Sequence, residues 1–102
     1  MIDHVVMLAL RGDADADDCR EVMTGLAQLV GEIEGFVAFS HGRNIDAEGK
    51  SSGFPYGFIG RFEDRAALAR YAADPRHQSL GARLVALCGG ADRIMVYDIE
   101  RA

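Results

Sequence analysis

The sequence lacks several features that would assign it to whole classes of protein. No run of apolar residues is long enough to span a bilayer, and the N-terminus begins in a strand-like segment without the layout of a signal peptide. Lysine and arginine form no cluster, and the formal net charge is −5. A negative chain without a basic patch argues against nucleic acid or an anionic membrane as a partner. These absences predict a cytoplasmic protein that binds neither.

Cysteine is scarce, and no motif for a metal or a nucleotide is complete. Cys19 and Cys88 both fall on apolar helix faces, which predicts two buried, reduced thiols. The three histidines lack the short spacing of metal ligands, and the acidic cluster before the first predicted helix lacks the glycine and glutamate of a calcium loop. The Gly-Lys-Ser at residues 49–51 lacks the rest of a phosphate loop. We therefore expect no cofactor and no metal.

What is present describes one globular domain. The chain has 102 residues, of which 49% are apolar and 26% are charged. This length supports a single hydrophobic core but not two, and the composition is typical of folded soluble proteins. We expect residues 1–102 to form a single domain.

The hydrophobic periodicity predicts an α+β fold with the element order β-α-β-β-α-β. This order is the ferredoxin-like arrangement, in which four strands form one antiparallel sheet. Residues 44–55 are polar and rich in glycine and serine, which indicates a mobile loop that could cover a pocket. The predicted elements are a strand at 2–10, a helix from Asp15 to Gly35, strands at 36–44 and 56–62, a helix at 65–71, a second helix at 75–88 after a break, and a strand at 93–100.

Both faces of the predicted sheet carry apolar residues. One layer of helices covers only one face, and a monomer would leave the other in water, where large apolar patches are unusual. We therefore predict a homodimer in which two sheets pack face to face. The residues assigned to this outer face are Val5, Met7, Val37, Phe39, Met95 and Tyr97.

A proline break between two helices brings polar side chains to the apolar interior. Asp74 has the position of an N-cap and Pro75 that of the first helical residue, which makes His77 the third residue of the new helix. His77 shares a face with the leucines that follow, and Tyr71 points inward from the preceding helix. His4 lies on a strand face whose other members are apolar. These three side chains are the candidate catalytic residues.

The same residues carry a resemblance to a known family. Along its whole length the chain resembles the Dabb family, the stress-responsive dimeric α+β barrel domains. This resemblance implies a dimeric barrel with a pocket between the helices and the sheet of each protomer. The stretches that carry it are Ile2-Asp3-His4-Val5-Val6, Gly42-Arg43-Asn44, Phe62-Glu63-Asp64, and the segment from Tyr71 to His77 together with Val96-Tyr97-Asp98.

The family includes a plant enzyme, olivetolic acid cyclase, to which the chain is distantly similar. That enzyme closes a linear polyketide by an intramolecular aldol condensation without a cofactor. The resemblance places His4 and His77 on its catalytic histidines and Tyr71 on its assisting tyrosine. Asp74 departs from the pattern, because a histidine is usual before the proline.

The residue types themselves fit acid–base chemistry. His77 lies near the positive end of a helix, which favours a neutral imidazole that can remove an α-proton from a β-keto substrate. Tyr71 or His4 would then donate a hydrogen bond to the developing oxyanion. An apolar or phenolic small molecule is the expected ligand class. Two alternatives stay open, namely a stress-associated dimer that binds its ligand without catalysis and a cofactor-free oxygenase on the same fold.

Overall fold

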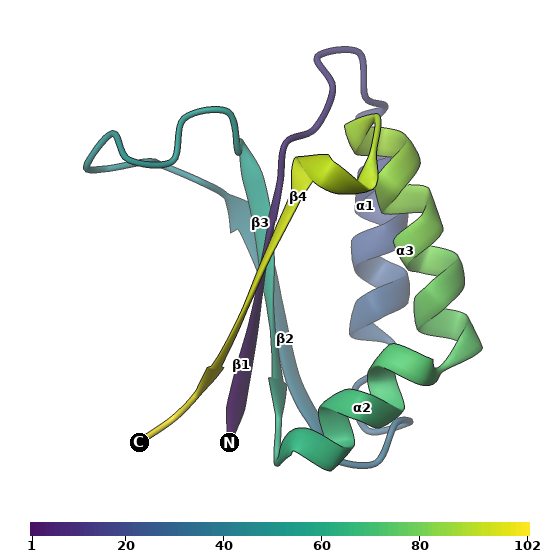
Figure 1. Cartoon of the computed structure of the whole chain (residues 1–102). Coiled ribbons are helices and arrows are strands. Elements are labelled where there is room, and N and C mark those ends of the chain that lie inside the picture. Colours follow the sequence, from purple (N-terminus) through teal and green to yellow (C-terminus); the bar gives the residue numbers. More distant parts are fainter.

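A computed structural model describes residues 1–102 and has the predicted ferredoxin-like order of elements (Figure 1). All strand pairs are antiparallel, and the sheet order is β2-β3-β1-β4. No helix in the structure combines the length and the apolar character needed to cross a membrane. The elements are β1 (Ile2–Leu8), α1 (Ala16–Ala27), β2 (Phe36–Arg43), β3 (Tyr56–Phe62), α2 (Arg65–Ala73), α3 (Pro75–Cys88), the 3₁₀ turn η1 (Ala91–Arg93) and β4 (Ile94–Glu100).

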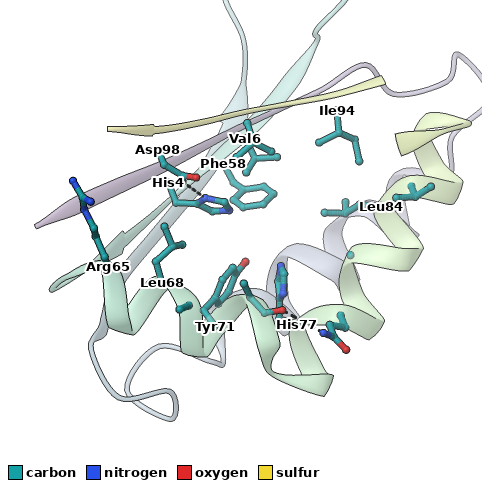
Figure 2. Close-up of a pocket in the computed structure, with 16 residues that line it drawn as sticks. His4, Val6, Phe58, Arg65, Leu68, Tyr71, His77, Leu84, Ile94 and Asp98 are labelled. Atoms are coloured by element: carbon teal, nitrogen blue, oxygen red, sulfur yellow. Dashed lines mark hydrogen bonds and ion pairs between the residues drawn. The ribbon is translucent and has the colours of Figure 1, made fainter. Parts of the chain in front are cut away.

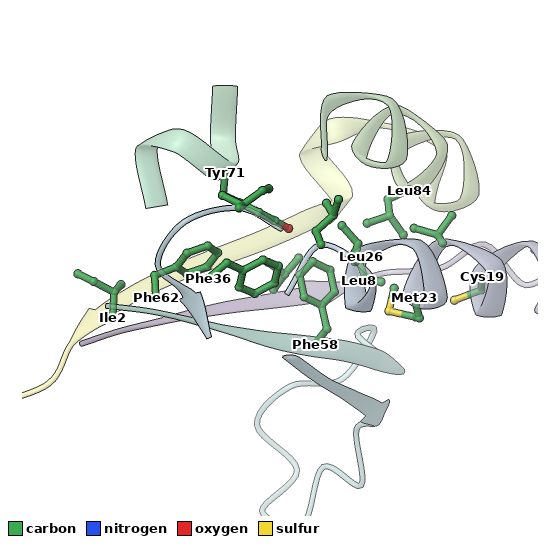
Figure 3. Packing of buried hydrophobic residues seen from close by; sticks show 14 of the residues in the cluster. Ile2, Leu8, Cys19, Met23, Leu26, Phe36, Phe58, Phe62, Tyr71 and Leu84 are labelled. Carbon is green, nitrogen blue, oxygen red and sulfur yellow. The ribbon is translucent and has the colours of Figure 1, made fainter. Parts of the chain in front are cut away.

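All three helices lie on one face of the sheet, and the core fills the space between them (Figures 1 and 3). Two aromatic rings of this core stack, with 4.6 Å between the centroids of Phe36 and Phe62. Each fully buried apolar side chain contributes about 1.5–3 kcal/mol relative to an exposed one. Both cysteines are buried and unpaired, as predicted. The largest fully buried side chains are Tyr71, Phe36, Phe62, Leu8, Met23, Leu26, Val22 and Cys88.

Helix α1 is shorter than the sequence predicted. It ends at Ala27, whereas the apolar spacing continued to Gly35. Beyond Ala27 the N–H of Leu29 donates to the carbonyl three residues back, and Gly31 adopts a left-handed backbone with φ of 82°. Leu29 and Ile33 are nevertheless buried. The apolar residues keep a helix-like spacing in the sequence beyond the end of α1 because the turn that follows buries them in the same hydrophobic core.

A β-bulge in β2 overturns one part of the predicted face assignment. The pairing with β3 shifts register between Phe36 and Ala38, so alternation does not continue through Val37. Phe39 was expected on the outer face, but it packs on the core side against Phe58, with 5.3 Å between the ring centroids. An inserted residue reverses which side chains point inward, and period two alone cannot detect it.

The 44–55 connection is held by its own polar side chains. The amide of Asn44 donates to Ser51 Oγ at 2.8 Å and to the Phe54 carbonyl at 2.9 Å, and Asp46 accepts from the Ser51 N–H at 2.8 Å. The loop projects from the side of the sheet opposite the helices (Figure 1). No residue of this loop lines the large cavity described next, so the loop does not cover it.

Candidate active site

A cavity of about 660 Å³ lies between the inner face of the sheet and helices α2 and α3 (Figure 2). Its wall is largely apolar, as is usual for sites that bind small molecules. His4 reaches it from β1, Tyr71 from the end of α2 and His77 from the start of α3. The structure therefore brings together all three residues that the sequence singled out.

Asp74 positions His77 by ending one helix and starting the next. It is the C-cap of α2 and the N-cap of α3, and its carboxylate accepts from the Arg76 N–H at 2.8 Å. Hydrogen bonds from the side chain and backbone of Arg76 lower the pKa of Asp74 to about 2. Pro75 begins α3, where its missing N–H leaves no hydrogen bond unmade. The His77 ring then packs against Tyr71, with 4.0 Å between the ring centroids and 37° between the ring planes.

His77 is held in its neutral form. Burial lowers its pKa, and the nearby His4 acts in the same direction, against the opposing effects of the Ala72 carbonyl and Asp74. The Nδ1 atom of His77 is buried and has no hydrogen-bond partner. Only Nε2 of this ring is therefore left to meet a ligand. A neutral imidazole with a free nitrogen in an apolar cavity has the properties of a general base.

His4, in contrast, is fixed by a partner. It lies opposite Asp98 in the register of β1 and β4, and His4 Nδ1 is 2.5 Å from Asp98 Oδ1. A carboxylate accepts hydrogen bonds, so Nδ1 of His4 carries the proton of this pair, and Nε2 is the nitrogen left for a ligand. The side chain of His4 is 13% exposed, compared with 44% for Asp98.

Tyr71 lies between the two histidines. Its ring centroid is 5.7 Å from that of His4, and the residue is only 1% exposed. Burial raises the pKa of Tyr71, so its hydroxyl keeps its proton and acts as a donor. Figure 2 shows that hydroxyl directed into the cavity. Contacts of its ring with Phe36 and Phe62 fix its orientation.

Sequence reasoning missed the role of Asp98. Asp98 lies in the segment Val96-Tyr97-Asp98, which carries the family resemblance, but the predicted site did not include it. Its alternation with Ile94 and Val96 on β4 was a usable signal, because a carboxylate on an inward-facing strand position needs a partner. The third histidine, His41, bonds Tyr56 instead, with 2.6 Å between Nδ1 and the hydroxyl, and does not line the cavity.

The cavity is polar at one end and apolar at the other (Figure 2). Arg65 and Asp98 lie at the polar end, and the Arg65 guanidinium is paired with Glu100 at 2.9 and 3.0 Å. Leu84 and Ile94 line the other end. The two histidines and the tyrosine lie between these ends. This arrangement suits a ligand with a polar group beside the imidazoles and an apolar remainder.

Known proteins share this sequence and this architecture. The sequence profile of the stress responsive A/B barrel domain, Dabb, matches residues 2–101. The Arabidopsis thaliana stress-response A/B barrel domain-containing protein HS1 is 28% identical over 99 residues, which are 97% of this chain and 88% of that protein.

Solved structures show the same fold. A dimeric ferredoxin-like protein of unknown function from Jannaschia sp. CCS1 is 46% identical and has a TM-score of 0.92, with 98% of both chains covered. The hydroxynitrile lyase from Passiflora edulis is 13% identical with a TM-score of 0.78, covers 99% of this chain and 94% of its own, and shares the fold alone. Since the family profile spans nearly the whole sequence, the chain belongs to the stress responsive A/B barrel domain family.

Proposed function

We propose that the cavity binds a β-keto compound with an apolar substituent and catalyses cofactor-free proton transfer at the carbon between its carbonyl groups. The reaction class is aldol-type carbon–carbon bond formation or cleavage, as in a cyclase or a lyase. The observation that carries this proposal is the neutral, half-buried His77, whose Nδ1 has no partner in the protein. Burying an unpaired polar atom costs about 1–3 kcal/mol, which a purely structural side chain at this position would avoid.

The first step divides the work among the three side chains. His77 Nε2 accepts a proton from the α-carbon of the substrate, and the electron pair of the broken C–H bond moves to the carbonyl oxygen. The Tyr71 hydroxyl donates a hydrogen bond to that developing enolate oxygen. His4, held by Asp98, faces the same cavity, and its Nε2 hydrogen-bonds a second polar group of the substrate and so orients it. Such bonds are strong where water is excluded.

The second step forms or breaks the carbon–carbon bond. In the direction of synthesis, the enolate carbon attacks a further carbonyl group, one to which it is not bonded, elsewhere in the same molecule, and the oxygen of that group takes a proton from protonated His77. Atoms and electrons balance without an oxidant or a metal. In the reverse direction His77 removes the hydroxyl proton as the bond breaks and returns it to the enolate carbon, and the ring opens to one linear compound.

Proton exchange gives a direct test. Methyl 3-oxohexanoate is incubated with the protein in D₂O, and NMR follows loss of the C2 proton signal relative to buffer alone. We expect the wild-type protein to accelerate the exchange and the His77→Ala variant to lose the acceleration. The matched control is His41→Ala, because His41 lies outside the cavity and should leave exchange unchanged.

Two other results would favour a different function for the cavity. Binding of the ester by calorimetry, without exchange above buffer, would identify a ligand-binding protein and exclude the catalytic role of His77. Consumption of oxygen in the presence of a phenolic ligand would indicate a cofactor-free oxygenase. Neither result is compatible with the aldol-type mechanism proposed for these residues.

A homodimer through the outer sheet face is part of the same proposal. Register places Ile59 and Tyr97 beside Val5, and Met95 beside Met7, on the face without helices. Met95 is 42% exposed and Tyr97 is 53% exposed in the isolated chain. The Jannaschia protein of 46% identity is described as dimeric. A second copy would remove this patch from water.

Sedimentation velocity tests the dimer. The wild-type chain should sediment with twice its 11.0 kDa mass, and Tyr97→Asp should yield monomers. Ile45→Asp is the control, since Ile45 is 86% exposed on the 44–55 loop and lies off the sheet. A wild-type monomer at micromolar concentration would exclude the proposed assembly.

A further inference from the structure

The polar end of the cavity carries one guanidinium, and a carboxylate of the same chain already occupies it. Arg65 is the only lysine or arginine among the residues that line the cavity. It is the first residue of α2, and its side chain is 80% exposed. Its Nε and Nη2 atoms donate to the two carboxylate oxygens of Glu100 at 3.0 and 2.9 Å. Arginine binds a free carboxylate in this same two-bonded geometry, so Glu100 fills the position that an anionic ligand would need.

The fold holds Glu100 beside this guanidinium. Glu100 is the last residue of β4, and it lies on the same face of the strand as Asp98, two residues earlier. The register places Glu100 opposite Ile2 of β1. Hydrogen bonds from Arg65 lower the pKa of Glu100, so its carboxylate is charged at neutral pH. Because Glu100 is tethered by the sheet, its effective concentration at Arg65 is high and a free carboxylate competes poorly with it.

A second carboxylate lies at the same end of the cavity. Asp98 lines the cavity and accepts the hydrogen bond from His4 Nδ1. A ligand carboxylate that displaced Glu100 from Arg65 would therefore lie close to two like charges, which disfavours its binding. The polar end of the cavity is thus unfavourable for an anion although it contains an arginine.

We propose that Glu100 is a specificity-determining residue, which occupies Arg65 and so makes the cavity bind an uncharged ester or ketone in preference to a carboxylate. The inference rests on the function proposed above and adds the charge class of the substrate. An uncharged carbonyl group needs no cation, because the Tyr71 hydroxyl supplies its hydrogen bond. The free acid that forms when such an ester is hydrolysed would not compete for the site.

The test compares two ligands that differ in the charge of one group. Calorimetry measures Kd for methyl 3-oxohexanoate and for freshly prepared 3-oxohexanoate. The wild type should bind the ester more tightly than the acid. Glu100→Ala frees the guanidinium, so Kd for the acid should fall by about 10–100-fold while Kd for the ester is unchanged. The double variant Arg65→Met with Glu100→Ala should lose this gain.

Glu63→Ala is the matched control. It removes one negative charge from a residue that does not line the cavity, and it leaves the pair of Arg65 and Glu100 intact. This variant should bind both ligands as the wild type does. The melting temperatures should stay close to that of the wild type, because an exposed ion pair contributes little to stability.

The outcomes separate this inference from the proposed function. If Glu100→Ala binds the acid no more tightly than the wild type does, or if Glu63→Ala gives the same gain, Glu100 does not determine specificity. Tighter binding of the acid than of the ester by the wild type would overturn the inference as well. A gain in acid binding by Glu100→Ala, without exchange of the ester C2 proton in any variant, would support the role of Glu100 and remove the catalytic function.

Discussion

The two histidines of the cavity differ in how the protein holds them. His4 comes from a strand and is bonded to Asp98, whereas His77 comes from a helix start and keeps an unpaired, buried nitrogen. The bond to Asp98 fixes the orientation and tautomer of His4, whereas burial lowers the pKa of His77 and favours the neutral ring, whose Nε2 can accept a proton. Two side chains that face one cavity therefore need not have equal roles. His77 is suited to move a proton, and His4 to orient the substrate.

The largest expected effect comes from removing the unpaired ring. His77→Ala should reduce exchange of the C2 proton by about 10²–10⁴-fold, the usual contribution of a positioned general base. The melting temperature should change little, because the lost contact with Tyr71 is offset by removal of a buried unpaired nitrogen. Differential scanning calorimetry checks the second point. A lower melting temperature with unchanged exchange would make His77 a packing residue.

Tyr71→Phe should have the next largest effect. The substitution keeps the buried ring and removes only the hydroxyl that faces the cavity. Loss of one oxyanion donor costs about 10²–10³ in kcat. Steady-state kinetics should show the loss in kcat rather than in KM. An unchanged kcat would mean that another group stabilises the enolate.

Asp98→Asn should act only through His4. An amide at this position no longer enforces the Nδ1–H tautomer, so catalysis should fall by about 10–100-fold through misorientation. In the double variant with His4→Ala the two losses should not add, because both remove one unit. If the activity losses of the two single variants add up in the double variant, Asp98 does not act through His4 and has a separate role.

The smallest expected effect is a pH dependence of stability from His77. Burial lowers the pKa of His77 below the value of about 6.5 in the unfolded chain, so the unfolded chain binds a proton more readily. Stability should therefore be highest above pH 6.5 and should decline as the pH falls from there to the lowered pKa. The free energy of unfolding is measured with urea for the wild type and His77→Ala over this pH range, and the difference between the two proteins gives the contribution of His77. Parallel curves for both proteins would show that the His77 pKa is not lowered.

The elements around the proline break were predictable because their signals are local. An aspartate followed by proline determines the end of α2 and the start of α3 within a few residues. Apolar periodicity likewise located β1, β3 and α3. These features depend on neighbouring residues, which the sequence displays directly.

The features that the sequence did not predict depend on contacts between segments far apart in the chain. The end of α1 is decided where Leu29 and Ile33 pack on the core, and tertiary packing preserves a helical spacing outside the helix. The bulge in β2 depends on pairing with β3, which no single segment contains. Asp98 gained its role only when β4 was placed beside β1 in a register opposite His4. Each miss is a property of two segments in contact.

The bend at Asp74 has a consequence for how this site can change. In an uninterrupted α-helix, residues six apart lie about 9 Å apart along the axis and on different sides, so the rings of Tyr71 and His77 would not be in contact. The distance between the Tyr71 and His77 rings is therefore set by the angle between helices α2 and α3. A substitution far from both rings could change the angle between α2 and α3. It would then alter the distance between the Tyr71 hydroxyl and the His77 imidazole, and with it the reactivity of the site, without replacing either residue.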